Sequence, residues 1–257
     1  MSDSLQRVFV TGLGIISPLG LDVPTTWDAI VKGKSGIDYI TSFDTEGFDT
    51  TFAAEVRGFN PENYLERKES RRMDRFAQFA AVAAQEACRQ ADLDLSSEDP
   101  FRVGAIIGSG IGGILTLSQQ YDVLRDRGPR RVTPFLIPMM LGDMASAQVS
   151  MVTGCMGANY CVVSSCSSGA DALGQGWQMI RRGQADVVLA GGSEAPIVPI
   201  AVAGFNSLRA LSRFNEDPQR ASKPFNRDRD GFVMGEGSAV LVLESEGHLK
   251  ARGVEAL

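Results

Sequence analysis

The chain has 257 residues, of which 44% are hydrophobic and 7% aromatic, enough apolar material for one large core or two small ones. Its 31 acidic and 25 basic residues give a net charge of −6, which argues against a general affinity for nucleic acid. No apolar run approaches the ~20 residues that span a bilayer, and no signal-peptide core follows Met1. We therefore expect a cytoplasmic protein without a membrane partner.

In the first part of the chain, apolar residues are spaced as in strands and helices on both sides of an irregular stretch. β-branched residues predict a strand that ends at Gly12 and Gly14, and the next helix should stop before Gly33. Scattered Asp, Gly, Thr and Pro predict an excursion, or cap, of the kind that often carries function. In chain order, the expected elements are a strand at 8–11, a helix at 25–31, the excursion around 36–70 and a long helix at 72–91.

The rest of the chain continues the alternation of strands and helices. Strands are expected at 103–107, 185–190 and 238–244, and helices at 114–124, 135–152, 170–182 and 246–252. A strand that alternates with helices in this way usually belongs to a sheet covered by those helices. The order predicts one layered α/β domain with a mixed, largely parallel sheet.

The four cysteines form neither a disulfide framework nor a zinc site, because no Cys-x-x-Cys pair is present and His248 is the only histidine. Cys88 lies in an alanine-rich helical run and is expected in the core. Cys161 alternates with Tyr160 and Val162, so we expect it buried in a strand. No metal is predicted.

Cys166 occupies the most informative position in the chain, a serine-rich turn between a short apolar run and the helix expected at 170–182. The first amides of a helix lack intrahelical partners and carry the positive end of the helix dipole, which favours a thiolate. The turn therefore predicts a nucleophilic cysteine. A general base would be expected nearby, but the run around His248 resembles a solvated surface helix, and we expect no catalytic role for this histidine.

The segment GSGIGG at 108–113 allows two interpretations. It fits the glycine pattern of a dinucleotide-binding loop, which would make the chain a nicotinamide-dependent oxidoreductase. However, the segment comes late in the chain, and Asp122 and Asp126 follow at less than the usual spacing. The alternative is that the glycines permit close backbone approach around a substrate channel or the Cys166 turn.

Basic residues gather in two short stretches, at 67–72 and 125–131. On a net-acidic chain such groups are either ordinary solvated charge or a docking surface for an acidic partner. The residue pattern alone leaves both interpretations open.

Five segments, in order and at similar spacing, make the chain resemble the elongating β-ketoacyl-acyl-carrier-protein synthases of the type II class. These condensing enzymes of fatty-acid synthesis belong to the thiolase-like superfamily. The segments are RVFVTGLGIISPLG at 7–20, GSGIGG at 108–113, SCSSG at 165–169, ADVVLAGGSE at 185–194 and KPFNRDRDGFVMGEG at 223–237. The resemblance implies the N-terminal repeat of a layered αβαβα fold, no cofactor, and subunits that pair across their sheets as a homodimer or with a complementary chain.

The resemblance also implies an activity and its residues. Cys166 would accept an acyl group from acyl carrier protein before decarboxylative condensation with malonyl-carrier protein, with its own amide in the oxyanion hole. Ile111 and Phe205 would border the acyl chain, and Phe232 would line the catalytic chamber. The positive patch that docks the acidic carrier would consist of Lys68, Arg71, Arg72, Arg130, Arg131 and Arg209.

Members of this class continue beyond the length of this chain, with two histidines and a lysine that support condensation and a phenylalanine whose amide completes the oxyanion hole. We therefore expect that this polypeptide alone does not condense. A binding alternative is a truncated or split chain that docks carrier protein without condensing activity. The reactivity of Cys166 separates the two, because a docking module needs no nucleophile.

Overall fold

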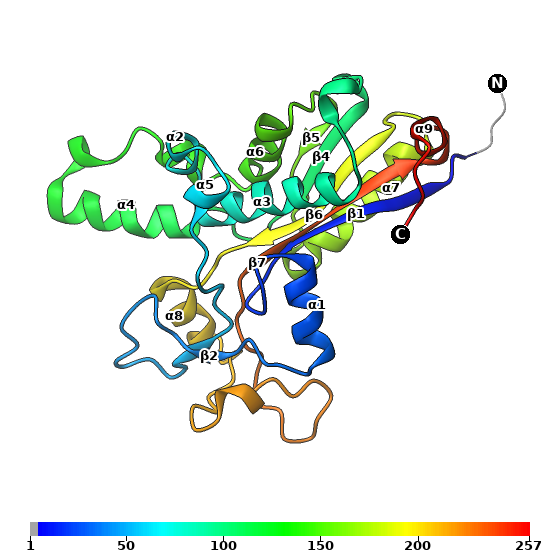
Figure 1. Cartoon of the computed structure of the whole chain (residues 1–257). Coiled ribbons are helices and arrows are strands. Elements are labelled where there is room, and N and C mark those ends of the chain that lie inside the picture. Colours follow the sequence, from blue (N-terminus) through cyan, green and yellow to red (C-terminus); the bar gives the residue numbers. More distant parts are fainter. Residues whose placement is uncertain (1–4) are drawn as a thin grey trace.

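A five-stranded sheet with helices on both faces forms the body of the computed structural model, which describes residues 5–257 (Figure 1). Its strands, in spatial order, are β1 (Val8–Ile16), β7 (Gly237–Ser245), β6 (Val187–Glu194), β4 (Val103–Gly108) and β5 (Asn159–Tyr160). Strand β7 pairs antiparallel with β1 and β6, whereas β4 pairs parallel with β6 and β5. The sheet is mixed, as expected, and its four pairs divide evenly between the two directions.

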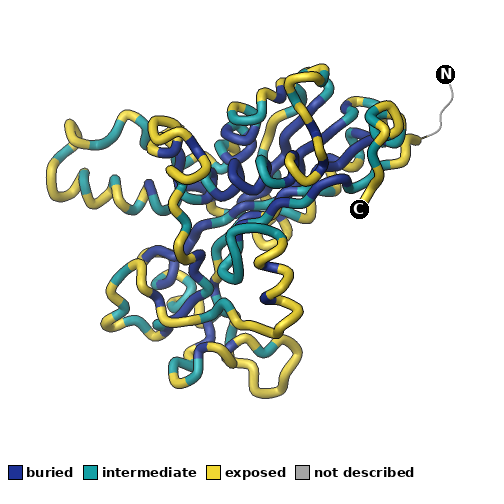
Figure 2. The backbone as a smooth tube through the Cα atoms, viewed as in Figure 1, coloured by how far each residue is buried: buried dark blue, intermediate teal, exposed yellow. Residues whose placement is uncertain are grey.

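The two faces of the sheet have separate cores because successive side chains in a strand point to opposite sides. On one face, Val187 and Leu189 pack with α3 (Arg75–Gln90) and α6 (Met144–Thr153). On the other face, Val188 and Ala190 pack with α7 (Ser168–Arg181). Figure 2 shows the sheet and α3 as the most buried part of the chain. This helix–sheet–helix layering is the N-terminal repeat that the resemblance implies.

Strand β1 does not end at its glycines, as the sequence had suggested, but runs through them to Ile16. A Cβ atom on Gly12 would lie 2.1 Å from the Ala87 carbonyl oxygen, and one on Gly14 would lie 1.8 Å from that of Ala83. These glycines therefore let the backbone of α3 rest directly on β1. The expectation was wrong because glycine in a strand can mark close packing as well as a turn.

The long helix expected from residue 72 begins at Arg75, because the Asp74 carboxylate caps it by accepting from the Phe76 amide at 3.3 Å. The other Asp74 oxygen accepts from the Thr116 amide at 2.7 Å, in the first turn of α4 (Ile114–Arg127). Burial raises the pKa of Asp74, against the opposing effect of these hydrogen bonds. One carboxylate thus fixes the starts of two helices. The short helix α2 (Arg67–Ser70) precedes it.

The single helix expected at 135–152 is divided into α5 (Leu136–Met140) and α6. Leu141 adopts an extended backbone at the end of α5, and the Met140 carbonyl accepts from the Gly113 amide at 3.1 Å instead of continuing the helix. The break follows from this contact with the glycine loop after β4. Such a long-range contact cannot be read from apolar spacing.

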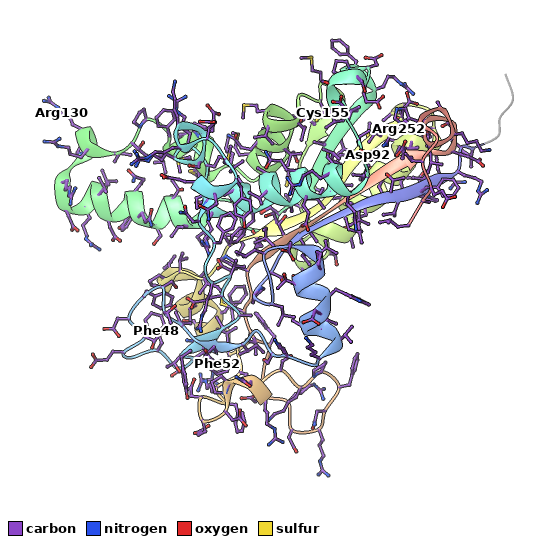
Figure 3. The ribbon with its side chains drawn as sticks, viewed as in Figure 1. Phe48, Phe52, Asp92, Arg130, Cys155 and Arg252 are labelled. Atoms are coloured by element: carbon purple, nitrogen blue, oxygen red, sulfur yellow. The ribbon has the colours of Figure 1, made fainter. Side chains whose placement is uncertain are left out.

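The first part of the excursion around 36–70 forms a lower lobe with the segment after β6, whereas its end, α2, lies beside α5 in the upper part of the molecule (Figure 1). The lobe contains a two-stranded antiparallel sheet of β2 (Asp38–Tyr39) and β3 (Phe52–Ala53). Phe48 and Phe52, labelled in Figure 3, belong to this lobe, whose core includes buried residues of α8 (Pro199–Ser207). The remaining helices are α1 (Val23–Val31) and α9 (Glu246–Arg252). No helix in the described range 5–257 combines the length and apolar character needed to cross a membrane.

Candidate active site

Cys166 lies where the sequence predicted it, in a turn at the N-terminus of α7, and its side chain is exposed. The preceding strand β5 ends at Tyr160, and the turn itself is a single 3-10 turn at Ser165–Ser167. Ser165 has a φ of +56°, a left-handed conformation that is uncommon outside glycine. The backbone therefore bends sharply one residue before the thiol, and α7 starts two residues after it.

Hydroxyl groups hold this bend in place. The Ser168 hydroxyl accepts from the Ser164 amide at 2.9 Å and donates to the Ser165 carbonyl at 2.7 Å. The Ser164 hydroxyl donates to the Asp171 carboxylate in the first turn of α7. The serines around the cysteine thus satisfy polar groups that a sharp turn would leave without partners.

Three glycines allow the first turn of α7 to lie directly on the ends of β4 and β6. A Cβ on Gly108 would lie 2.2 Å from the Ser168 carbonyl oxygen, and one on Gly192 would lie 2.9 Å from the Gly169 Cα. Real Cβ atoms do not occupy such positions. The contact brings the start of α7, and with it Cys166, to the edge where β4 and β6 both end.

Cys166 opens into a cavity of about 570 Å³ at this edge. The same cavity is lined by Ile111 and Phe205, which were expected to border an acyl chain, and by Phe232, which was expected to line the catalytic chamber. The Phe205 and Phe232 rings meet edge to face, with centroids 5.3 Å apart, and Ile111 keeps 40% of its surface exposed. The structure therefore brings together four residues from four separate segments of the sequence.

The other three cysteines are less accessible. Cys88 is buried, as expected, and burial raises its pKa to about 12. Cys155 is also buried. Cys161 differs from expectation, because β5 ends before it and leaves it half-buried, although burial still raises its pKa. Cys166 is the one exposed thiol of the four.

The glycine loop after β4 is packed in a way that disfavours a dinucleotide site. Cβ atoms on Gly112 and Gly113 would lie 2.9 Å from the Met140 carbonyl oxygen and 2.1 Å from that of Met139. The Thr116 amide at the start of α4, which would face a pyrophosphate, is bonded to Asp74. The glycines serve close backbone approach, the second of the two interpretations. Among residues 5–257, no group of three or more His, Cys, Asp or Glu side chains is arranged to hold a metal ion.

Glu194, the last residue of β6, also lines the cavity and was not among the residues predicted from the sequence. Its carboxylate accepts from the Ser109 hydroxyl and the Gly110 amide, both at 2.7 Å. The available signal was an acidic residue two positions after the glycine pair that follows the buried apolar run 185–190. Which donors it meets depends on the pairing of β4 with β6, which the sequence does not specify.

The six basic residues proposed to bind carrier protein are all exposed but are divided between two lobes. Arg130, labelled in Figure 3, lies at the tip of the arm formed by α4, and the Arg72 guanidinium stacks on the Phe135 ring at 4.9 Å beside α5. Arg209 follows α8 in the lower lobe (Figure 1). Within residues 5–257, Arg71 approaches Glu62 at 3.9 Å. Among the ion pairs of the described part of the chain, none involves the other five: Lys68, Arg72, Arg130, Arg131 and Arg209.

His248 lies outside the cavity, in a charged cluster at the opposite end of the sheet from Cys166. Its Nδ1 is 2.6 Å from the fully buried Glu244 carboxylate, and its Nε2 is 2.8 Å from Glu98. Glu244 also pairs with Arg252 at 3.0 Å, and Arg252 donates to the Asp92 carbonyl, beside which Figure 3 shows it. The expected solvated position was wrong for this side chain, because the two carboxylates hold the imidazole with only 16% of its surface exposed.

A mixed sheet with an exposed cysteine at the N-terminus of a covering helix, opening into a partly apolar cavity, defines an α/β protein of the thiolase-like class. Residues 5–248 match the family model described as beta-ketoacyl synthase, N-terminal domain. The chain belongs to the β-ketoacyl synthase family and corresponds to this domain.

Two relatives and one solved structure illustrate the similarity. The chain is 48% identical over 248 residues to 3-oxoacyl-[acyl-carrier-protein] synthase 2 of Staphylococcus aureus (strain COL), covering 96% of this chain and 60% of the relative. It is 44% identical over 250 residues to the protein of that name from Synechocystis sp. (strain ATCC 27184 / PCC 6803 / Kazusa), covering 97% and 60%. A type II PKS ketosynthase solved in complex with its acyl-carrier protein has a TM-score of 0.85 at 32% identity, covering 98% and 61%. The chain thus spans about 60% of the length of the curated relatives it matches.

The His248 cluster makes a pH-dependent contribution to stability. Burial alone lowers the pKa of His248, but hydrogen bonds to Glu98 and Glu244 outweigh it and raise the pKa above the ordinary value of 6.5. The contribution is complete below the unfolded-state pKa and is lost as the pH rises through the folded-state pKa. We expect urea unfolding of the wild-type chain to show a falling free energy of unfolding from about pH 6 upward. The His248→Gln variant should lack this decline, and parallel pH profiles for the two proteins would contradict the prediction.

Proposed function

We propose that this chain is the acyl-accepting portion of a β-ketoacyl-acyl-carrier-protein synthase of fatty-acid elongation, with Cys166 as its nucleophile. The observation that carries the proposal is the position of the Cys166 thiol, exposed at the N-terminus of α7 in the same cavity as Ile111, Phe205 and Phe232. Family membership and the name of the curated relatives support the reaction class.

The acyl transfer uses groups that this chain supplies. The Cys166 thiolate attacks the carbonyl carbon of an acyl thioester on carrier protein, and the C–S bond to the carrier breaks. The carrier thiol leaves as a thiolate and takes up a proton, so the acyl group remains on Cys166. The thiol lies at the positive end of the α7 dipole, and the Cys166 amide is the donor to the oxyanion.

In the complete reaction, malonyl-carrier protein loses carbon dioxide and its carbanion attacks the acyl group, which becomes longer by two carbons. That step requires donors that stabilise the developing enolate. The only histidine of the chain, His248, is held in the cluster with Glu98 and Glu244, away from the cavity. We therefore propose that this chain accepts an acyl group but does not condense it without groups from outside its 257 residues.

The aromatic and aliphatic side chains of the cavity suit an acyl tail. Phe205 and Phe232 form an edge-to-face pair, and Ile111 is exposed beside the turn that carries the thiol. An alkyl chain that leaves water for such a surface gains roughly 0.8 kcal/mol for each buried methylene. We assign Ile111 and Phe205 to the acyl chain and Phe232 to the reaction chamber.

We also propose that the exposed basic residues dock acyl carrier protein, which is acidic. The ketosynthase of similar fold that was solved with its acyl-carrier protein supports such a partner. Five of the residues lie on the upper body and arm, and Arg209 lies in the lower lobe, so the carrier would contact both. Such charges steer association and orient the partner more than they add affinity.

The proposal includes a cytoplasmic location and a homodimer. Strand β5 forms an edge of the main sheet, and the exposed side chains of Met156, Tyr160 and Val163 lie on or beside it. An exposed edge with apolar neighbours favours pairing with a second copy. Sedimentation of the chain as a monomer at all accessible concentrations would exclude this part of the proposal.

The alternative is a module that binds carrier protein without accepting its acyl group. The exposed thiol favours the enzyme, because binding alone gives no reason to hold a cysteine at a helix N-terminus beside a cavity. The chemical state of Cys166 after contact with an acylated carrier decides between them.

Intact-mass analysis after incubation with acyl-carrier protein should show one acyl group on the wild-type chain. The Cys166→Ala variant should transfer at least about a hundredfold less, because the nucleophile is gone. The matched Cys161→Ala variant, which removes the half-buried neighbouring thiol, should be acylated as the wild type is. An unmodified wild-type chain, or acylation that survives in Cys166→Ala, would contradict the proposed function.

Reversing charge at the tip of the α4 arm tests the docking surface. The double variant Arg130→Glu/Arg131→Glu should associate with carrier protein roughly tenfold more slowly at low salt, with a smaller difference at high salt. The matched control is Arg125→Glu/Arg127→Glu on the same arm, which changes the net charge by the same amount; the native Arg125 side chain pairs with Asp126. Stopped-flow association that is equally slowed in both variants would show that only net charge matters and would contradict the assignment.

A further inference from the structure

The Glu194 carboxylate organises a whole loop. Besides the Ser109 hydroxyl and the Gly110 amide, it accepts from the Ile111 amide at 3.2 Å. The Gly112 amide donates to the Ser109 oxygen at 3.0 Å, so a fourth residue is tied to the carboxylate through that hydroxyl. Consecutive N–H groups that converge on one anion form a rigid concave binding site, here filled by a side chain of the same protein.

The loop lies between Glu194 and the turn that carries Cys166. A Cβ on Gly110 would lie 3.0 Å from the Glu194 Oε2 and 3.5 Å from the Ser165 carbonyl oxygen. The next residue, Ile111, has its amide on the carboxylate and its side chain exposed on the cavity. The position of the Ile111 side chain relative to Cys166 therefore depends on where Glu194 holds the loop.

The partners of Glu194 in the described structure are neutral donors. Within residues 5–257 it forms no ion pair with a lysine or arginine, and its bonded partners are the hydroxyl and the amides of the loop. Bonds from neutral donors to a carboxylate are stronger than those to an uncharged acceptor, which gives the loop a defined geometry. An amide at position 194 would offer one acceptor oxygen and would direct its own N–H groups toward the loop amides.

We propose that Glu194 is a positioning residue that sets the acyl-chain selectivity of Cys166 through Ile111. The inference rests on the proposed function, in which Ile111 borders the acyl chain. With the carboxylate in place, the loop is clamped and Ile111 limits the depth of the cavity next to the thiol. Without the carboxylate, the loop relaxes and the Ile111 side chain moves away from the space that the acyl chain occupies. The rate of Cys166 acylation then rises for longer acyl chains relative to shorter ones.

The test compares Cys166 acylation rates for butyryl- and dodecanoyl-carrier protein by intact-mass kinetics. Glu194→Gln should shift the ratio of the two rates toward the longer chain by roughly tenfold, the scale on which a pocket distinguishes chain lengths. Ser109→Ala, which removes one donor and keeps the carboxylate, should shift the ratio in the same direction by less. A wild-type ratio in a folded Glu194→Gln protein, or in Ser109→Ala if Glu194→Gln does not fold, would overturn the inference.

Combining the Glu194 and Ile111 substitutions in one protein tests whether Glu194 acts through Ile111. On an Ile111→Ala background, Glu194→Gln should no longer change the ratio, because the side chain that it positions is absent. An undiminished shift on that background would contradict the assigned route. If the wild-type chain accepts neither acyl group, the proposed function is wrong. If the wild-type chain is acylated and Glu194→Gln leaves the ratio of the two rates unchanged, only the role of Glu194 is wrong.

Glu86→Gln is the matched control for a merely structural effect. The Glu86 carboxylate also accepts from two backbone amides, those of Ile15 at 2.8 Å and Val23 at 2.7 Å, and it does not line the cavity. Its substitution should lower the free energy of unfolding and leave the acylation ratio unchanged. A ratio shift in Glu86→Gln equal to that in Glu194→Gln would show that general destabilisation, rather than loop geometry, controls selectivity.

Discussion

Contact between backbones at Gly108, Gly169 and Gly192 brings the first turn of α7 onto the ends of β4 and β6, and the candidate site depends on it. A helix that packs through side chains would stand several ångströms further from the sheet. The close approach puts the dipole end of α7, the exposed thiol and the loop after β4 at one edge. Without it, Cys166 would remain an exposed cysteine but would not share a cavity with Ile111.

Strands β4 and β6 pair in parallel, so the segments that follow them emerge at the same edge of the sheet. The segment after β4 carries Ile111, and β6 ends at Glu194, whose carboxylate returns to that loop. Parallel pairing thus explains why residues more than eighty positions apart meet in one carboxylate-centred network. The same edge receives Phe205 and Phe232 from the lower lobe. The cavity therefore forms where the parallel strands β4 and β6 end, and side chains from both lobes line it.

Local patterns in the sequence predicted the turn at Cys166, the core position of Cys88 and the alternation of strands and helices. They failed where a distant backbone supplies the decisive contact. Gly14 continues β1 because α3 rests on it, and Leu141 ends a helix because Met140 bonds to the loop after β4. The positions of the three cavity residues came from family resemblance, and Glu194 required coordinates. The spacing of apolar residues shows which side of a helix or strand is buried, but it does not show which other segment of the chain packs against that side.

The acylation rate of the Gly169→Ala variant tests the importance of this glycine contact most directly. An added Cβ would lie 3.2 Å from the Gly192 Cα, close enough to displace the start of α7 slightly without breaking the core. We predict that transfer from acyl-carrier protein to Cys166 falls at least about tenfold while urea unfolding changes little, because covalent chemistry is sensitive to small misplacements. Wild-type acylation by a folded Gly169→Ala protein would contradict the claim that this contact positions the thiol.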